Sequence, residues 1–206
     1  MLWHLLLRSF DLIKRLHEVA RIQSGYLSRG RVEQLPDGEY RLLQARDVSP
    51  DDGVRWTSAI RFDPERDPNP YQVSKDDILL VARGQEHLAV LIREELTNTL
   101  ASSVFHILRP RLEHVRPAYL AWCLNQPDVR AAINTGAGGT GISYLSRQVV
   151  EKLEVRIPSL GSQDRIINIL NLWERAKSLR KRIEERQAHL VQSACRTLAT
   201  AEPTEP

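Results

Sequence analysis

The C-terminal part of the chain carries a helical pattern of apolar residues. Pro158 and Gly161 end a short apolar strand, and residues 162–199 then contain neither Gly nor Pro. Ser162 stands where an N-cap is expected, and Asp164 follows where a negative charge favours the helix dipole. Apolar side chains then recur at steps of three and four, interrupted by Arg186, at Ile169, Leu172, Ala176, Leu179, Ile183 and Leu190. This pattern predicts one long helix over 162–199.

The apolar stripe of this helix is narrow. Charged residues surround Ile183 on both sides, from Arg180 to Arg186. Thin stripes suit pairs of helices better than they suit the broad face of a sheet. We therefore interpret the segment as a coiled-coil spacer or dimerisation helix, and the alternative is that it packs back on its own domain.

The remainder of the chain alternates short apolar runs with turn signals. The run Ile78–Ala82 ends at Arg83-Gly84, and the run Leu88–Ile92 reads as its hairpin partner. Further strands are expected over residues 19–24, 40–48, 100–108 and 153–157. Residues 61–70 contain several prolines and are expected to form a loop.

Helix signals lie at both ends of this region. Pro117 and Pro127 each stand where Pro at N1 opens a helix, and Ser146 is placed to cap a short helix. Near the N-terminus, Trp3, Leu6, Phe10 and Ile13 follow approximate helical spacing and predict a short amphipathic helix over 1–15. The order of elements predicts a mixed α+β domain over 1–161, followed by the helix 162–199 and a disordered tail over 200–206.

The net charge of +3 is distributed unevenly. Residues 162–199 hold 8 Lys and Arg against 4 Asp and Glu, whereas residues 1–161 hold 21 against 20. A nearly neutral domain can attract nucleic acid only through a local basic patch.

The N-terminal apolar run is too short to span a bilayer. Cys123 and Cys195 show no metal spacing. We therefore expect a cytoplasmic protein with reduced thiols.

Several motifs approach known catalytic patterns without completing them. The run Gly136–Gly141 approaches a phosphate-binding loop, but Ile142 replaces the Lys and the preceding pattern is helical. Asn69-Pro70-Tyr71 is only part of the loop that binds the target amino group in amino-methyltransferases, and no glycine-rich cofactor motif accompanies it. Carboxylates lack the nearby Lys of a metal-dependent nuclease, and the six His show no ligand spacing. We therefore expect no enzyme activity, metal or cofactor.

The order of several phrases resembles the target-recognition domain of the DNA-specificity subunit of type I restriction-modification systems. The phrases are Val19-Ala-Arg-Ile-Gln-Ser-Gly25, Leu43-Gln-Ala-Arg-Asp-Val48, Lys75–Gly84, Tyr119–Asn125, Gly141–Ser146, Leu153–Pro158 and Gln163–Ile166. Asp76 stands where the family usually has Gly, and the usual Glu before Gln163 is absent.

The resemblance implies a role and partners. The family's full-length subunit joins two recognition domains by two long antiparallel helices, and this chain resembles half of it. Two copies, or this chain and a second half-subunit, would pair through antiparallel helices and read a bipartite site on double-stranded DNA. The implied partners are a DNA adenine methyltransferase subunit and a translocating nuclease subunit. The alternative is an adaptor or inhibitor in a phage-defence assembly that has kept the fold without reading sequence.

The candidate DNA contacts are loop residues whose side chains carry planar groups that donate hydrogen bonds. Arg and Gln suit the edges of guanine and adenine, and Tyr can stack. The candidates are Arg29, Arg31, Arg46, Arg83, Gln85, Tyr144 and Arg147. We hypothesise that four of them form a cluster, namely Arg29, Arg31, Arg83 and Arg147.

Overall fold

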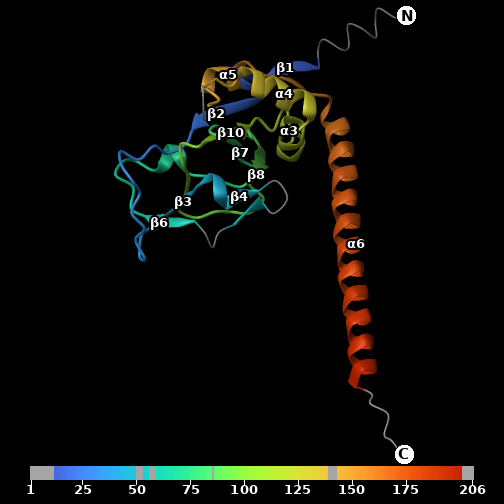
Figure 1. Ribbon diagram of the computed structural model, residues 1–206. Coiled ribbons are helices and arrows are strands. Elements are labelled where there is room, and N and C mark those ends of the chain that lie inside the picture. The colour runs from blue at the N-terminus through green and yellow to red at the C-terminus, as the bar shows by residue number, and fades with distance from the viewer. Residues whose placement is uncertain (1–11, 50–52, 56–58, 85, 139–142, 201–206) are drawn as a thin grey trace, which may run out of the picture. The chain divides into compact units, whose positions relative to one another are not determined.

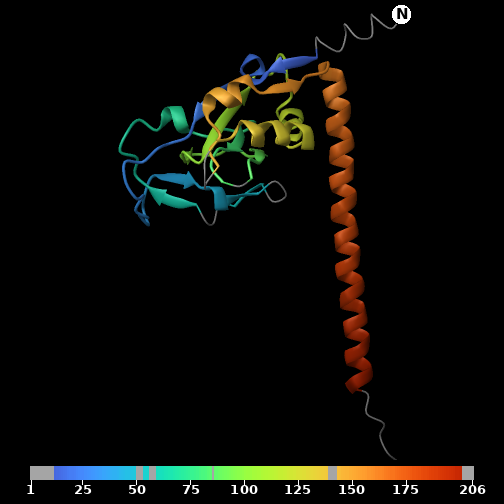
Figure 2. The same ribbon diagram turned by 45° about the horizontal axis from the view of Figure 1, so that its top comes forward.

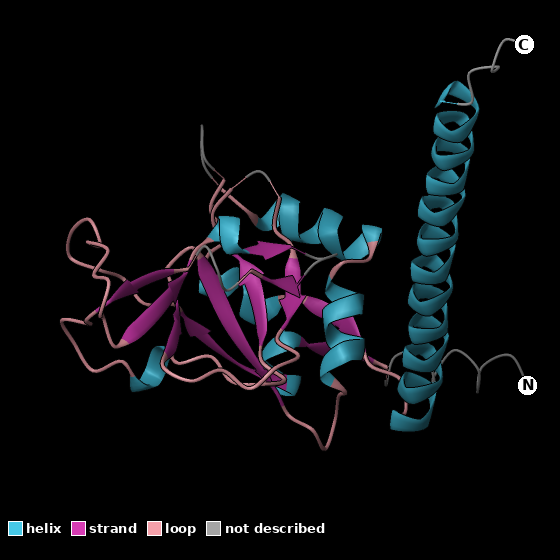
Figure 3. Ribbon diagram, turned by 90° about the horizontal axis from the view of Figure 1, so that it is seen from below, coloured by secondary structure: helices cyan, strands magenta, loops and turns pink. Residues whose placement is uncertain are grey.

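A computed structural model describes residues 12–49, 53–55, 59–84, 86–138 and 143–200 (Figure 1). The chain divides into two compact units, Met1–Asp164 and Arg165–Pro206, and each is described by itself. In the first unit the strands fill the middle and short helices lie along the edge (Figure 3). This arrangement of mixed sheets with helices, followed by a long C-terminal helix, confirms the predicted α+β class.

The core of the first unit is a four-stranded antiparallel sheet in the order β2-β10-β7-β8. Its strands are β2 (Ala20–Ser24), β10 (Phe105–Pro110), β7 (Ile78–Val81) and β8 (Ala89–Leu91). Every residue of β7 is buried, as expected for a central strand with an unbroken apolar run. Leu79 of β7 pairs with Val90 of β8, which confirms the predicted hairpin.

A three-stranded sheet in the order β6-β3-β9 packs beside this core. Its strands are β6 (Ile60–Phe62), β3 (Tyr40–Leu43) and β9 (Thr99–Ala101). The prediction of one strand over 100–108 was wrong, because a turn at Ser102 separates β9, which pairs parallel to β3, from β10. The strand expected over 40–48 likewise ends at Leu43, and β6 occupies the start of the expected loop.

Two small sheets complete the strands of the described region. They pair β1 (Ile13–Arg15) with β11 (Glu154–Arg156), and β4 (Val48–Ser49) with β5 (Gly53–Val54). The helix expected over 1–15 therefore does not extend to Arg15, because the backbone of Ile13–Arg15 forms an antiparallel ladder with β11. The rest of that expected helix, with Trp3, Leu6 and Phe10, lies outside the described residues.

The short helices are α2 (Leu16–Val19), α3 (Pro117–Leu124), α4 (Pro127–Gly136) and α5 (Arg147–Lys152), with 3-10 turns η1 (Ala45–Asp47) and η3 (Asn69–Tyr71). Three of the short helices, α3, α4 and α5, begin where their sequence signals predict, whereas α2 was not predicted and includes Val19, which was expected in a strand. Pro117 and Pro127 occupy the first helical position of α3 and α4. Ser146 caps α5, since its hydroxyl accepts the N–H of Val149 at 3.3 Å.

Helix α6 spans Leu160–Thr200 as one uninterrupted helix (Figure 2). It begins two residues before the predicted start, and the expected N-cap at Ser162 was wrong. The hydroxyl of Ser159 instead accepts the N–H of Ser162 at 3.4 Å. Thr200, expected in the tail, belongs to the helix, and residues 201–206 lie outside the described residues. No helix in the described part of the chain is long and apolar enough to cross a membrane.

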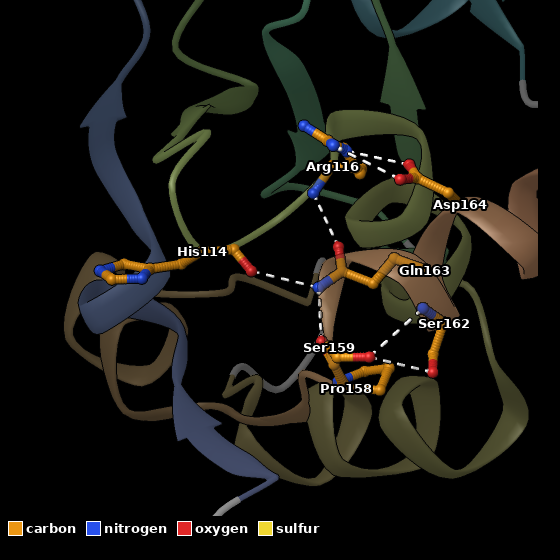
Figure 4. Close-up of polar contacts among 7 residues, drawn as sticks. All are labelled: His114, Arg116, Pro158, Ser159, Ser162, Gln163 and Asp164. Atoms are coloured by element: carbon orange, nitrogen blue, oxygen red, sulfur yellow. Dashed lines mark hydrogen bonds and ion pairs between the residues drawn. The ribbon is translucent and has the colours of Figure 1, made fainter.

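The first turn of α6 is fixed to the domain by one buried side chain (Figure 4). Gln163 is fully buried, and its amide nitrogen donates to the carbonyls of His114 at 3.1 Å and Pro158 at 2.7 Å. Its amide oxygen accepts the N–H of Arg116 at 2.8 Å. Beside it, the Arg116 guanidinium binds the carboxylate of Asp164 at 2.9 Å. All polar groups of the Gln163 side chain are thus satisfied without water.

Candidate nucleic-acid interface

A short segment after the glycine-rich run lies beside the end of β7. Gly84 donates its N–H to the carbonyl of Ser143 at 3.1 Å, and Leu145 donates to the carbonyl of Ala82 at 2.8 Å. Arg83 and Tyr144 are therefore direct antiparallel neighbours. The segment Ser143–Leu145 extends the central sheet and places Tyr144 at its surface.

The side chains of Arg83 and Tyr144 contact each other. The guanidinium carbon of Arg83 lies 5.3 Å from the ring centre of Tyr144, and the Tyr144 side chain is well exposed at 43%. A cation–π contact of this kind holds the planar guanidinium in place while its N–H groups remain available for hydrogen bonds. The pair therefore combines a forked donor with an exposed aromatic ring, the two groups that contact base edges and base faces.

Two buried histidines fix this segment from beneath. The Nδ1 atom of His87 donates to the carbonyl of Val81 at 2.8 Å, and its Nε2 atom forms a hydrogen bond with the hydroxyl of Ser143 at 3.1 Å. The Nε2 atom of His106 donates to the carbonyl of Leu145 at 2.8 Å. Residues on both sides of Tyr144 are thus held by buried rings. Histidine spacing in the sequence gave no signal for these roles, because both contacts join segments far apart in the chain.

The electrostatics of this support favour a neutral His106 ring. Burial lowers the pKa of His106, and the nearby Arg147 charge lowers it further, while the hydrogen bond to the Leu145 carbonyl acts in the opposite direction. At neutral pH the ring therefore carries one proton, on the nitrogen that donates to Leu145.

The described element before the glycine-rich run differs from that of a phosphate-binding P-loop. A P-loop follows a strand, whereas helix α4 ends at Gly136 immediately before this run. Gly138 and Tyr144 exchange backbone hydrogen bonds at 3.1 and 2.8 Å, which closes the run on itself. Residues 139–142 lie outside the described residues.

The other predicted contact residues fall in separate places. Arg147 opens α5, three residues after Tyr144, and its guanidinium pairs with Glu151 at 2.7 Å. Arg46 lies in η1 with 61% of its side chain exposed, and its guanidinium is 3.8 Å from the buried Asp47. Gln85 lies outside the described residues.

Arg29 and Arg31 lie on the exposed loop between β2 and β3. Arg31 borders a cavity of about 290 Å³ whose floor includes Tyr26 and Phe62. This loop lies beside β6, away from α5 (Figure 1). The hypothesised cluster is therefore distributed over two groups, one with Arg29 and Arg31 and the other with Arg83 and Arg147.

Residues that approached catalytic patterns have structural partners. Asp77 is buried, accepts the N–H of Ser74 at 2.9 Å, and lies 3.7 Å from the guanidinium of Arg109. Burial raises the pKa of Asp77, and these contacts oppose the shift. Tyr71 packs edge-on against Tyr26, with ring centres 5.4 Å apart.

The chain's thiols are free, with Cys195 exposed and Cys123 buried. Burial raises the pKa of the Cys123 thiol, and it raises the pKa of the neighbouring Tyr119 to about 12. Neither group is therefore an activated nucleophile at neutral pH. Among the residues that the structure describes, no group of three or more His, Cys, Asp or Glu is placed to hold a metal ion.

Comparison with known proteins identifies the family. The family described as "Type I restriction modification DNA specificity domain" matches residues 12–186. No protein with a curated description matches the chain. Among solved structures, the HsdS subunit from Thermoanaerobacter tengcongensis is similar with a TM-score of 0.63 and 16% identity, over 94% of this chain and 50% of that chain. The type I restriction-modification system S subunit from M. genitalium is similar with a TM-score of 0.53 and 16% identity, over 92% of this chain and 46% of that chain.

A third solved structure, described as the "structural basis underlying complex assembly and conformational transition of the type I R-M system", has a TM-score of 0.61 and 17% identity. It covers 87% of this chain and 42% of that chain. The chain thus spans about half the length of the solved chains that it matches. The match to the family model covers most of the sequence, and the solved structures show the same fold. The chain therefore belongs to the family of type I restriction-modification DNA specificity domains.

Proposed function

We propose that the chain is a non-catalytic module that binds double-stranded DNA and reads its sequence through the surface that carries Arg83 and Tyr144. The observation that carries this proposal is the contact between these two exposed side chains, on a segment held by buried His87 and His106. Because the Arg83 guanidinium and the Tyr144 ring already contact each other, they lose little conformational freedom when they contact a base.

The charge distribution supports a local contact. Residues 1–161 hold 21 Lys and Arg against 20 Asp and Glu, so attraction to phosphates must come from exposed groups near the reading surface. Arg147 adds a second arginine beside Tyr144, and Arg29, Arg31 and Arg46 supply further forked donors elsewhere on the domain. In this proposal Arg83 and Arg147 read bases, whereas Arg29, Arg31 and Arg46 contact the phosphates of the DNA backbone and position the domain on the duplex.

Helix α6 supplies the second part of the function. Its apolar seam, Ile169, Leu172, Ala176, Leu179, Ile183 and Leu190, pairs with a second long helix from another copy or from a second half-subunit. Pairing of this kind brings two recognition domains to the two halves of a bipartite site, with the helix length setting their separation. Two identical halves would read a palindromic site.

The chemistry belongs to partners in this proposal. A DNA adenine methyltransferase subunit binds S-adenosylmethionine and transfers its methyl group to DNA. A translocating nuclease subunit joins this subunit in a restriction complex. The assembly acts on DNA in the cytoplasm and restricts phage DNA. Membership of the specificity family favours this function over that of an adaptor without DNA reading.

A methylation map of the genome tests the proposal directly. N6-methyladenine is mapped at single-molecule resolution in the native host, with the gene intact and with the gene deleted. Deletion is expected to remove methylation from one split motif, and a gene carrying Arg83→Ala is expected to restore less of it than the wild-type gene. An unchanged map after deletion would contradict the assignment of a specificity module in that host.

A further inference from the structure

Helix α6 exposes an apolar seam beyond its anchored first turn. From Asn171 to Thr200 every residue is exposed, and the large seam residues Leu172, Leu179 and Leu190 expose 63%, 55% and 67% of their surface. Within the second unit, the described residues form this one helix and include no other element that could cover these side chains. An apolar stripe on an otherwise charged helix indicates a surface for another helix.

Several of the positions that flank the seam carry arginine. With Ile169 at position a of the heptad and Leu172 at d, Arg175 and Arg182 fall at position g, and Arg180 falls at position e. Arg186 occupies a d position within the seam itself.

The acidic residues of the same stretch do not flank the seam. Glu174, Glu184 and Glu185 fall at positions f, b and c, on the side of the helix away from the apolar stripe. The e and g positions between Trp173 and Arg196 therefore include several arginines and no acidic residue.

Pairing between two copies would bring like charges together. In a parallel pair, position g faces position e of the following heptad, so Arg175 meets Arg180 of the other copy. In an antiparallel pair, position g faces position g, so Arg175 and Arg182 again meet an arginine or His189. Charges at these positions determine which helices pair, because opposite signs attract and like signs repel.

We propose that α6 docks with a helix of a different chain whose flanking e and g positions carry Glu or Asp, and not with a second copy of itself. A carboxylate in that helix would also neutralise Arg186, which otherwise enters the seam as an unpaired cation. This inference rests on the helix-pairing part of the proposed function and is independent of DNA reading.

In the experiment, a charge-reversed variant of this chain serves as the partner with acidic flanks. A variant with Arg175→Glu, Arg180→Glu and Arg182→Glu keeps the same seam but reverses the charge of its flanks. Sedimentation equilibrium at low salt measures association of the wild-type chain, of the variant, and of an equimolar mixture. The mixture is expected to form a 1:1 complex at least about tenfold tighter than either self-association, and the difference should decrease at high salt.

A matched control places the same total change in charge on the opposite side of the helix. It carries Lys177→Glu, Lys181→Glu, Ser178→Glu and Gln192→Glu, at positions b, f and c. This control should not bind the wild-type chain more tightly than the wild-type chain binds itself. Circular dichroism of every variant checks that the helix is retained.

Three results would overturn the inference. A wild-type homodimer as tight as the mixed complex would show that the flanks do not select the partner. Absence of association in every sample would show that the helix does not pair in this way, while DNA binding by the same samples would still report on the recognition surface. Loss of DNA affinity in the charge-reversed variant, without a mixed complex, would assign the arginines to the DNA backbone.

Discussion

The side-chain oxygen of Gln163 accepts the backbone N–H of Arg116 at 2.8 Å. Arg116 is the N-cap residue of α3, so this bond joins the beginning of α3 to the first turn of α6. The amide nitrogen of Gln163 donates to two carbonyls, which only an amide can do while its oxygen accepts. This geometry explains why a glutamine stands at this position, where the resemblance to the family already predicted one.

Replacement of Gln163 should strongly destabilise the first unit. Gln163→Ala leaves the N–H of Arg116 and two carbonyls without their partner, at a cost of about 1–3 kcal/mol for each group that water cannot reach. Gln163→Glu should be worse at neutral pH, because a carboxylate oxygen would face the carbonyls of His114 and Pro158. Chemical denaturation measures both changes. The half-exposed Asp164, which pairs with Arg116, serves as the control, and Asp164→Ala should lose less.

The stability of the domain should decrease as pH falls below neutrality. The pKa of His106 is lowered from 6.5 in the folded state, so between the lowered value and 6.5 the unfolded chain binds more protons. The free energy of unfolding therefore decreases as pH falls through this window, with a slope of at most about 1.4 kcal/mol per pH unit from this group.

His106→Gln tests this assignment. The glutamine amide can still donate to the Leu145 carbonyl but does not titrate. Denaturation midpoints measured between pH 5 and 8 should change less with pH in the variant than in the wild-type chain. Equal slopes in the two proteins would assign the pH dependence to other groups.

Asp76 should tolerate glycine better than any β-branched residue. Its backbone has a φ of 70°, in the left-handed region, at the turn that leads into β7. L-residues lose about 1–2 kcal/mol in this region, although Asp and Asn lose less. We expect Asp76→Gly to be neutral or to stabilise by up to about 1 kcal/mol, and Asp76→Val to destabilise by more than about 1 kcal/mol. A decrease in thermal stability for Asp76→Gly would contradict this account.

The elements that could be predicted from the sequence are those with local signals. The β7–β8 hairpin follows from two apolar runs separated by Gly84, and helices α3 and α4 follow from Pro117 and Pro127 at their first positions. The usual glycine of the family at position 76 likewise agrees with the positive φ found there.

Features that depend on long-range contacts could not be predicted in the same way. The parallel pairing of Leu42 with Leu100 joins distant segments, and no local pattern indicates it. For the candidate site, sequence reasoning named Arg83 and Tyr144 separately, and their contact appears only in the structure. The supporting rings of His87 and His106 were missed for the same reason.

Removal of the Arg83–Tyr144 pair should weaken and broaden DNA binding. After the bound motif has been found by selection from a random duplex library, Arg83→Ala should lose about 1–3 kcal/mol of discrimination at the base that it reads. Tyr144→Ala should lose a similar amount if the ring contacts the DNA. Arg83→Lys keeps the charge and should recover affinity without recovering discrimination. Arg130→Ala, at a partly buried position of α4 outside the candidate contacts, is the control and should bind as the wild-type chain does.

The two arginine groups should differ in their effect on salt dependence. Each phosphate contact that is removed lowers the slope of log affinity against log salt by about 0.9. We expect Arg29→Ala with Arg31→Ala to reduce this slope and to weaken all sequences alike, because that loop lies beside β6 and away from α5 (Figure 1). Arg83→Ala with Arg147→Ala should instead reduce preference for the selected motif, because Arg83 contacts Tyr144 and Arg147 follows Tyr144 by three residues. Fluorescence anisotropy at several salt concentrations, with the motif and with a scrambled duplex, separates these outcomes.

If the variant with all four alanines kept the wild-type affinity and slope, neither group would contact DNA, and the reading surface would have to lie elsewhere on the domain.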